Sequence, residues 1–122
     1  MPVLYLQILC IVWRNPKIKM IIAFDVDDTL VIPSVAGIAM YDSPNYDVIN
    51  VFKFFQSQGH QMIIWSGGGI QYAENWANRL GLAPCEIRVK QKSLDVDICF
   101  DDCDVDLAKV NIKVKRLNNS IS

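Results

Sequence analysis

Hydrophobic and polar positions follow two different periods along this chain. From Met20 onward, short continuously apolar runs alternate with longer segments in which apolar residues recur every three to four positions. Continuous apolar runs are typical of strands buried on both faces, and the longer period is typical of amphipathic helices. The alternation predicts an α/β fold with a three-layer, doubly wound (Rossmann-like) parallel sheet covered by helices.

The apolar runs predict five strands. The first two are expected over 21–24 and 61–65, and the others at about 86–89, 96–100 and 111–114. Each of the first four is followed, directly or within a few residues, by a polar side chain that can take part in chemistry.

Three helices are predicted between these strands. The first begins near Asp42, with Ser43 as its N-cap and Pro44 at the first helical position, and Gly59 ends it. Its inward-facing residues are Val48, Val51, Phe52 and Phe55. The second carries the stripe Tyr72, Trp76 and Leu80 and ends at Gly81. A short third helix is expected over 105–109.

The remaining segments connect or flank the predicted domain, 20–116. Residues 31–41 contain Pro and Gly and suit a flap or a tight hairpin. Residues 1–19 are an N-terminal extension, and the sequence leaves open whether it is an upstream addition, a packed element or a mis-assigned start. Its apolar run is shorter than the ~20 residues that a membrane span needs and lacks the flanks of a signal peptide. Residues 117–122 read as a polar tail.

Composition excludes several classes of protein. Twelve basic and 13 acidic residues give a formal net charge of −1, so no strong overall field attracts nucleic acid or an anionic membrane. The four cysteines have no Cys-x-x-Cys spacing, which favours reduced thiols in a cytoplasmic protein. With His60 as the only histidine, and expected at the surface, a nitrogen-rich metal site cannot be assembled.

Chemically reactive side chains follow four of the predicted strands. In chain order they are Asp25 and Asp27, Ser66, Lys92, and Asp101 with Asp102. Because the carboxyl ends of parallel strands meet at one edge of a sheet, these groups are expected to converge in one crevice. Carboxylates crowded in this way repel one another unless a cation balances them, and all-oxygen coordination suits Mg²⁺. Mg²⁺ is therefore the expected cofactor.

A cation at this edge would allow a phosphate ester to bind. Lys92 and the Ser66 hydroxyl would then contact the phosphoryl oxygens as charge redistributes. The glycine run that begins at Gly67 would let backbone N–H groups approach the phosphate at the start of a helix. The predicted partner is a phosphorylated substrate, either a small molecule or an exposed phosphate on a macromolecule, and oligomeric state is left open.

These residues resemble the motifs of the haloacid dehalogenase (HAD) superfamily. The run Phe-Asp-Val-Asp-Asp-Thr-Leu at 24–30 resembles its first signature, Asp-x-Asp-x-Thr-Leu after a hydrophobic strand. Ser66 resembles the second motif, Lys92 the third and 100–102 the acidic fourth, in family order. The resemblance implies a HAD-like hydrolase domain with no separate cap domain, because no insertion is large enough for one.

The resemblance also implies roles for individual residues. Asp25 would attack phosphorus and form an aspartyl-phosphate, which makes the protein a Mg²⁺-dependent phosphatase, a phosphoric monoester hydrolase. Asp27 would act as general acid and then general base, with its backbone carbonyl on the metal. Thr29 would support the loop. Asp102 is the first choice for direct metal ligation and Asp101 the second, and Asp25 is also expected at the metal.

Departures from the family pattern keep alternatives open. Asp28 stands where the family commonly has Gly. Lys90 also lies near the third motif, and Lys92 is preferred because it falls in the loop that leads into the fourth strand. Asp106 could hold a metal-bound water. The alternatives to an enzyme are a catalytically degenerate HAD-fold binding protein and a phospho-receiver signalling domain, whose motif order differs from the one here.

Overall fold

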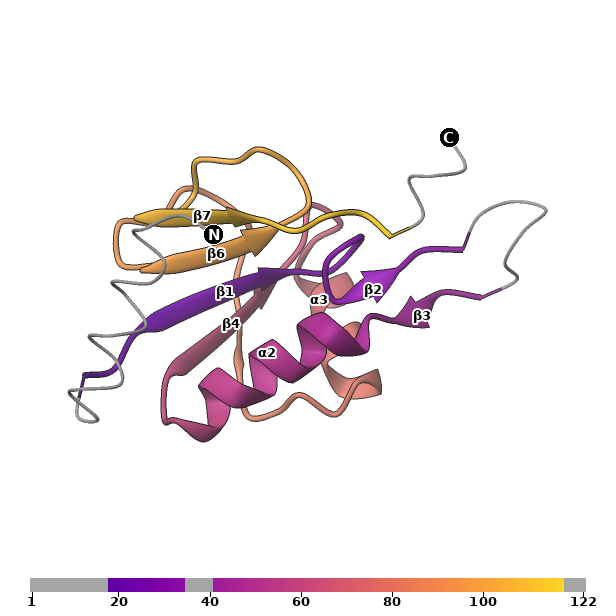
Figure 1. Ribbon diagram of the computed structural model, residues 1–122, viewed down its shortest axis with the longest axis horizontal. Helices are drawn as coiled ribbons and strands as arrows, with labels where there is room; N and C mark the ends of the chain where they lie inside the picture. Colours follow the sequence, from indigo (N-terminus) through magenta and orange to yellow (C-terminus); the bar gives the residue numbers. More distant parts are fainter. Residues whose placement is uncertain (1–17, 35–40, 118–122) are drawn as a thin grey trace.

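The main sheet has five parallel strands. The computed structural model describes residues 18–34 and 41–117. In the order in which they lie side by side, the strands are β5 (Glu86–Ile87), β4 (Gln61–Trp65), β1 (Ile21–Asp25), β6 (Ile98–Asp101) and β7 (Val110–Lys113) (Figure 1). The predicted parallel α/β sheet is therefore confirmed, with every predicted strand present within two residues at either end.

The strand order separates two of the predicted alternatives. Numbered along the chain, the sheet strands lie in the order 3-2-1-4-5, so the direction of winding reverses beside β1. This order is compatible with a Rossmann-like sheet, whereas receiver domains have the order 2-1-3-4-5. The strand order therefore argues against the receiver interpretation.

Two helices pack on one face of the sheet. These are α2 (Tyr46–Ser57) and α3 (Ile70–Arg79). Phe52 of α2 and Trp76 of α3 join one buried cluster with Ile22, Phe24 and Ile64, which project from the same side of their strands. Phe24 also stacks on Phe100 of the neighbouring strand, with ring centroids 4.4 Å apart. Both strand–helix–strand connections therefore cover the same face.

The other face is covered by a loop. Ala23, Ile63 and Cys99 form a second cluster, against which Val105 and Leu107 pack. The predicted helix over 105–109 is wrong: the described residues carry no helix on this face, so the predicted third layer is not found in them. The reason is local, because the Asn111 side-chain oxygen accepts hydrogen bonds from the N–H groups of Leu107 and Ala108, at 2.9 and 3.0 Å.

The first helix begins later than predicted. Ser43 and Pro44 form β3 (Ser43–Pro44), which pairs antiparallel with β2 (Val31–Ile32), and the Asn45 N–H continues this pairing to the Leu30 carbonyl at 2.9 Å. Ser43 is therefore not an N-cap, and Asn45 takes that position. The predicted hairpin is confirmed at its base, and its middle lies outside the described residues. Figure 1 shows this hairpin projecting beyond the carboxyl ends of the strands.

Of the predicted inward-facing residues, Phe52 and Phe55 are buried, whereas Val48 and Val51 are half-buried and Ile49 completes the buried stripe. The N-terminal extension up to residue 17 and residues 118–122 of the polar tail lie outside the described residues. Within 18–34 and 41–117, no helix combines the length and apolar character needed to cross a membrane.

Candidate active site

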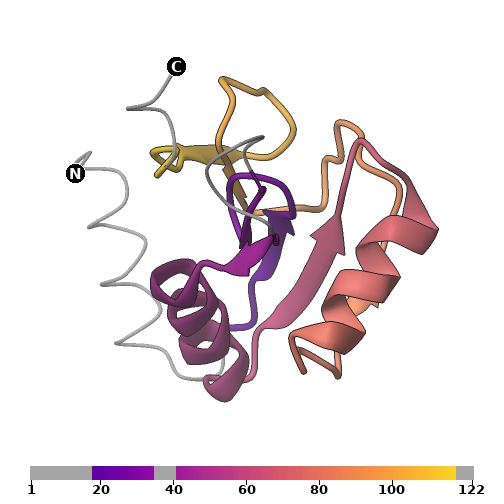
Figure 2. The same cartoon turned by 90° about the vertical axis from the view of Figure 1, so that its right-hand side faces the viewer.

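The parallel register brings three reactive residues to one edge of the sheet. Asp25, the last residue of β1, is paired with Trp65 of β4, so Ser66 follows immediately beside it. On the other side Phe24 is paired with Phe100, which places Asp101 level with Asp25. Figure 2 looks toward this edge, where the strands of the sheet end.

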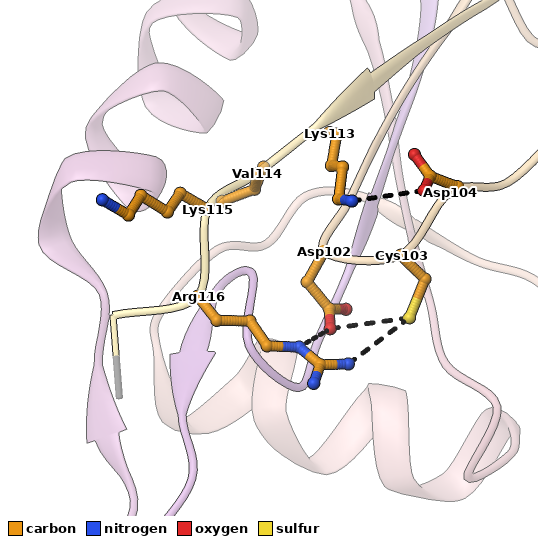
Figure 3. A pocket seen from close by; sticks show the side chains of 7 residues that line it. All are labelled: Asp102, Cys103, Asp104, Lys113, Val114, Lys115 and Arg116. Carbon is orange, nitrogen blue, oxygen red and sulfur yellow. Dashed lines mark hydrogen bonds and ion pairs between the residues drawn. The ribbon is translucent and has the colours of Figure 1, made fainter. Parts of the chain in front are cut away.

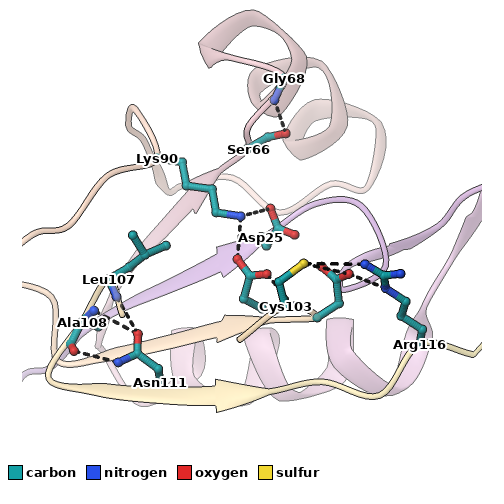
Figure 4. A network of polar contacts seen from close by, with 11 residues as sticks. Asp25, Ser66, Gly68, Lys90, Cys103, Leu107, Ala108, Asn111 and Arg116 are labelled. Carbon is teal, nitrogen blue, oxygen red and sulfur yellow. Dashed lines mark hydrogen bonds and ion pairs between the residues drawn. The ribbon is translucent and has the colours of Figure 1, made fainter. Parts of the chain in front are cut away.

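Lys90 joins two of the carboxylates. Its Nζ lies 3.2 Å from Asp25 Oδ1 and 2.6 Å from Asp101 Oδ2 (Figure 4). Asp101 is fully buried and Asp25 is 5% exposed. Burial alone would lower the pKa of Lys90, but the two carboxylates outweigh it and raise that pKa. Lys90 therefore carries a positive charge beside the two buried carboxylates of Asp25 and Asp101.

A third carboxyl group, that of Asp102, is near enough to Asp25 to affect its pKa. Burial, followed by the nearby Asp101 charge, raises the pKa of Asp25 to about 7, although Lys90 opposes this shift. Burial acts in the same direction on Asp102, but hydrogen bonds from Arg116 and Asp25 outweigh it and lower the pKa of Asp102. The two carboxyl groups therefore influence each other, with the pKa of Asp25 raised and that of Asp102 lowered.

Asp102 has a cationic partner from the segment after β7. Arg116 donates from Nε to Asp102 Oδ2 at 2.7 Å and also lies 3.9 Å from Asp28 Oδ2. Asp102 is 8% exposed, and Figure 3 shows the Arg116 guanidinium next to its carboxylate. Arg116 thus occupies one side of the carboxylate that we expected to bind a metal.

Asp27 is held by an aromatic residue from α3. The Tyr72 hydroxyl donates to Asp27 Oδ1 at 2.6 Å, and burial together with this hydrogen bond raises the pKa of Tyr72 to about 12. A Cβ atom built at Gly68 would lie 3.1 Å from the Tyr72 ring, so glycine leaves room for the ring to lie here. Asp27 itself is exposed to solvent.

The turn after β1 explains the departure at position 28. Asp28 has a φ of 60°, in the left-handed region where glycine is favoured and Asp is tolerated. Its N–H donates to the Val31 carbonyl at 2.7 Å. The Thr29 side chain, which we expected to support this loop, is fully buried, and its Oγ1 has no hydrogen-bond partner among the described residues.

The Ser66 hydroxyl is held by the turn that follows β4. Its Oγ accepts a hydrogen bond from the Gly68 N–H at 3.0 Å, and the residue is 5% exposed. An oxygen that accepts from the backbone keeps its own O–H free to donate. Gly67 is exposed in the turn that leads to α3, and Gly69, with a φ of 103°, stands at the N-cap of this helix.

Two predicted residues lie elsewhere. Lys92 is 62% exposed and pairs with Asp106 at 3.0 Å, whereas Lys90 occupies the place beside Asp25 that we assigned to Lys92. The structure therefore places Lys90, and not the preferred Lys92, beside Asp25. The Ser93 N–H donates to the Leu107 carbonyl, which holds the loop after Lys92 against the face of the sheet where Leu107 packs. Asp106, expected near a metal-bound water, is 78% exposed in this outer pair.

The carboxylates fit Mg²⁺ by the chemistry of their donors. One ligand atom each from Asp101, Asp102 and Cys103 lies within 4.8 Å of the others, and Asp25 is near Asp102. The carboxylate oxygens suit Mg²⁺, whereas a thiol does not. The Asp101 charge that raises the pKa of Asp25 is a further sign of fit, since a divalent cation would offset the repulsion between these carboxylates. Asp101 and Asp102 would hold the ion, with Asp25 beside them.

Sequence reasoning missed Tyr72 and Arg116. Tyr72 was read as part of an inward-facing stripe, and its hydroxyl reaches past the core to Asp27. Arg116 lies 14 residues from Asp102 and meets it only because β6 and β7 are neighbours. Comparison of the chain with family models, curated proteins and solved structures finds no match.

Proposed function

We propose that the protein is a Mg²⁺-dependent phosphomonoesterase that acts through an aspartyl-phosphate on Asp25. The observation that carries this proposal is the position of Asp25, which is buried at the end of β1, beside the Lys90 ammonium and near the Asp102 carboxyl. A nucleophilic carboxylate, a fixed cation and metal-binding carboxylates are the parts that phosphoryl transfer requires. The HAD-like motif order supports the same chemistry.

In the first step, a deprotonated Asp25 oxygen forms a bond to phosphorus while the bond from phosphorus to the leaving oxygen breaks. Lys90 faces Asp25 and stabilises the negative charge on the phosphoryl oxygens. The free O–H of Ser66 donates to one of these oxygens. Bound Mg²⁺ would supply further charge neutralisation at the phosphoryl group.

Asp27 moves the protons. As a carboxylic acid it donates a proton to the leaving oxygen, so that an alcohol departs. As a carboxylate it then takes a proton from a water molecule, whose oxygen attacks the phosphorus of the aspartyl-phosphate and releases phosphate and free Asp25. Asp27 is exposed, as a group that meets both the leaving group and water must be.

A hydrolysis assay distinguishes this proposal from the degenerate alternative, a HAD-fold binding protein that does not turn over substrate. The purified protein should hydrolyse 4-nitrophenyl phosphate with Mg²⁺, lose this activity in EDTA, and lose it in Asp25→Asn. Asp47→Asn, an exposed carboxylate in the first turn of α2, is the matched control and should retain activity. Binding of phosphate by the wild-type protein without any turnover would favour the degenerate alternative, and full activity in Asp25→Asn would remove Asp25 from the mechanism.

A further inference from the structure

An open groove of about 560 Å³ begins at the candidate active site. It lies between the residues that follow β6 and the end of β7 with the residues after it (Figure 3). Asp102 and Arg116 belong to both the groove and the site, because Asp102 lies beside Asp101 at the end of β6 and Arg116 donates to it at 2.7 Å. A substrate whose phosphoryl group lies on Asp25 can therefore extend into this groove.

The charges in the groove favour an anion. Asp102 is already balanced by Arg116 at 2.7 Å. Asp104 pairs with Lys113 at 3.2 Å, but these side chains are 86% and 60% exposed, and such ion pairs are weak and exchange partners easily. Lys115 also lines the groove and has no ion pair among the described residues. Lys115 is thus not balanced by a carboxylate of the described residues, and Lys113 is held only loosely by Asp104.

We infer that this groove binds a second anionic group of the substrate. The inference rests on the proposed function and narrows it to phosphomonoesters whose leaving group carries a phosphate or carboxylate of its own. Lys115, whose side chain extends away from Asp102 in Figure 3, turns toward that group, and Lys113 turns from Asp104 toward it. Because both lysines are solvent-exposed, their contribution to binding is electrostatic and weakens as salt increases.

The kinetic test compares two substrates that differ by one anionic group, phenyl phosphate and 4-carboxyphenyl phosphate, at low ionic strength. The wild-type protein should have a kcat/KM roughly fivefold higher for the carboxylated substrate, since one close charge pair near a surface is worth about this factor. In Lys115→Gln the ratio of the two kcat/KM values should fall toward one. Lys53→Gln, an exposed lysine on α2, is the matched control and should keep the wild-type ratio.

A ratio near one in the wild-type protein, or a ratio that Lys115→Gln leaves unchanged, would overturn the inference. A binding experiment separates this failure from failure of the proposed function. Titration calorimetry should show that 4-carboxyphenylphosphonate binds more tightly than phenylphosphonate to the wild-type protein, and that Lys115→Gln loses the difference. If this binding preference is found but neither phosphate ester is hydrolysed, the groove is supported and the proposed reaction is not; equal binding of the two phosphonates contradicts the groove.

Discussion

The Nζ atom of Lys90 lies 3.2 Å from Oδ1 of Asp25, although 65 positions separate the two residues in the chain. The same ammonium group lies 2.6 Å from Asp101 Oδ2. A single lysine thus balances two buried carboxylates that end neighbouring strands, β1 and β6. This arrangement distinguishes Lys90 from the other lysines of the described residues, whose carboxylate partners, where they have them, are much more exposed.

Lys90→Gln should reduce kcat for aryl phosphate hydrolysis by roughly a hundredfold, because loss of one preorganised cation or donor at a phosphoryl group typically costs that much. The matched control is Lys92→Gln, which removes an exposed lysine that is only two residues away. Steady-state kinetics of both variants with Mg²⁺ checks this prediction. Equal losses in the two variants would show that the structure selects the wrong lysine.

Arg116→Gln should tighten Mg²⁺ binding. The guanidinium donates to Asp102 Oδ2, the oxygen that a divalent cation would also contact, so the two cations compete for it. The dissociation constant for Mg²⁺, measured by titration calorimetry, should fall by roughly three- to tenfold, a modest factor because Arg116 is partly exposed. Lys109→Gln, which removes an exposed lysine that pairs with Asp97, serves as the control. Weaker Mg²⁺ binding in Arg116→Gln would mean that the guanidinium supports the metal site instead.

Tyr72→Phe should impair the protonation of poor leaving groups. The hydroxyl fixes the Asp27 carboxyl at 2.6 Å, and a general acid that is less well oriented protonates the leaving oxygen less effectively. We expect kcat to fall by about tenfold for an alkyl phosphate and to change little for 4-nitrophenyl phosphate, whose leaving group needs no proton. A loss of equal size with both substrates would indicate that Tyr72 has only a structural role.

His60 should make the fold less stable as pH falls. Its Nδ1 accepts a hydrogen bond from the Met20 N–H at 3.0 Å, and burial lowers its pKa below the usual 6.5. The unfolded chain therefore binds a proton at His60 more readily than the folded chain does, so stability is present above about pH 6.5 and is lost below it. Urea denaturation should show a lower free energy of unfolding at pH 5.5 than at pH 7. His60→Asn, which cannot titrate, should lose less over the same interval; an identical loss would exclude His60 as the cause.

Much of the fold was predictable because its strands are continuously apolar. The strand predicted at 61–65 has these same bounds in the structure, and β1 differs by one residue. The meeting of Asp25 with Asp101 and Asp102 was also predictable, since parallel strands bring their carboxyl ends to one edge whatever the distance along the chain.

The remaining features depend on long-range contacts that local patterns do not contain. Ser43 and Pro44 form a favourable local helix start, but pairing with β2 determines their conformation. The choice between Lys90 and Lys92 depends on the path of an irregular loop. His60 was expected at the surface after Gly59, yet it is buried, and its Nδ1 accepts the Met20 N–H.

The central claim is that Asp25 becomes phosphorylated, and trapping the phosphoenzyme tests it most directly. The wild-type protein should be mixed with substrate and Mg²⁺, quenched in acid and digested, and the peptides analysed by mass spectrometry. The account predicts one added phosphoryl group on the peptide that contains Asp25, sensitive to hydroxylamine as an acyl phosphate is, and absent from Asp25→Asn. Hydrolysis that proceeds with no modified peptide, or with the phosphoryl group on another residue, would contradict it.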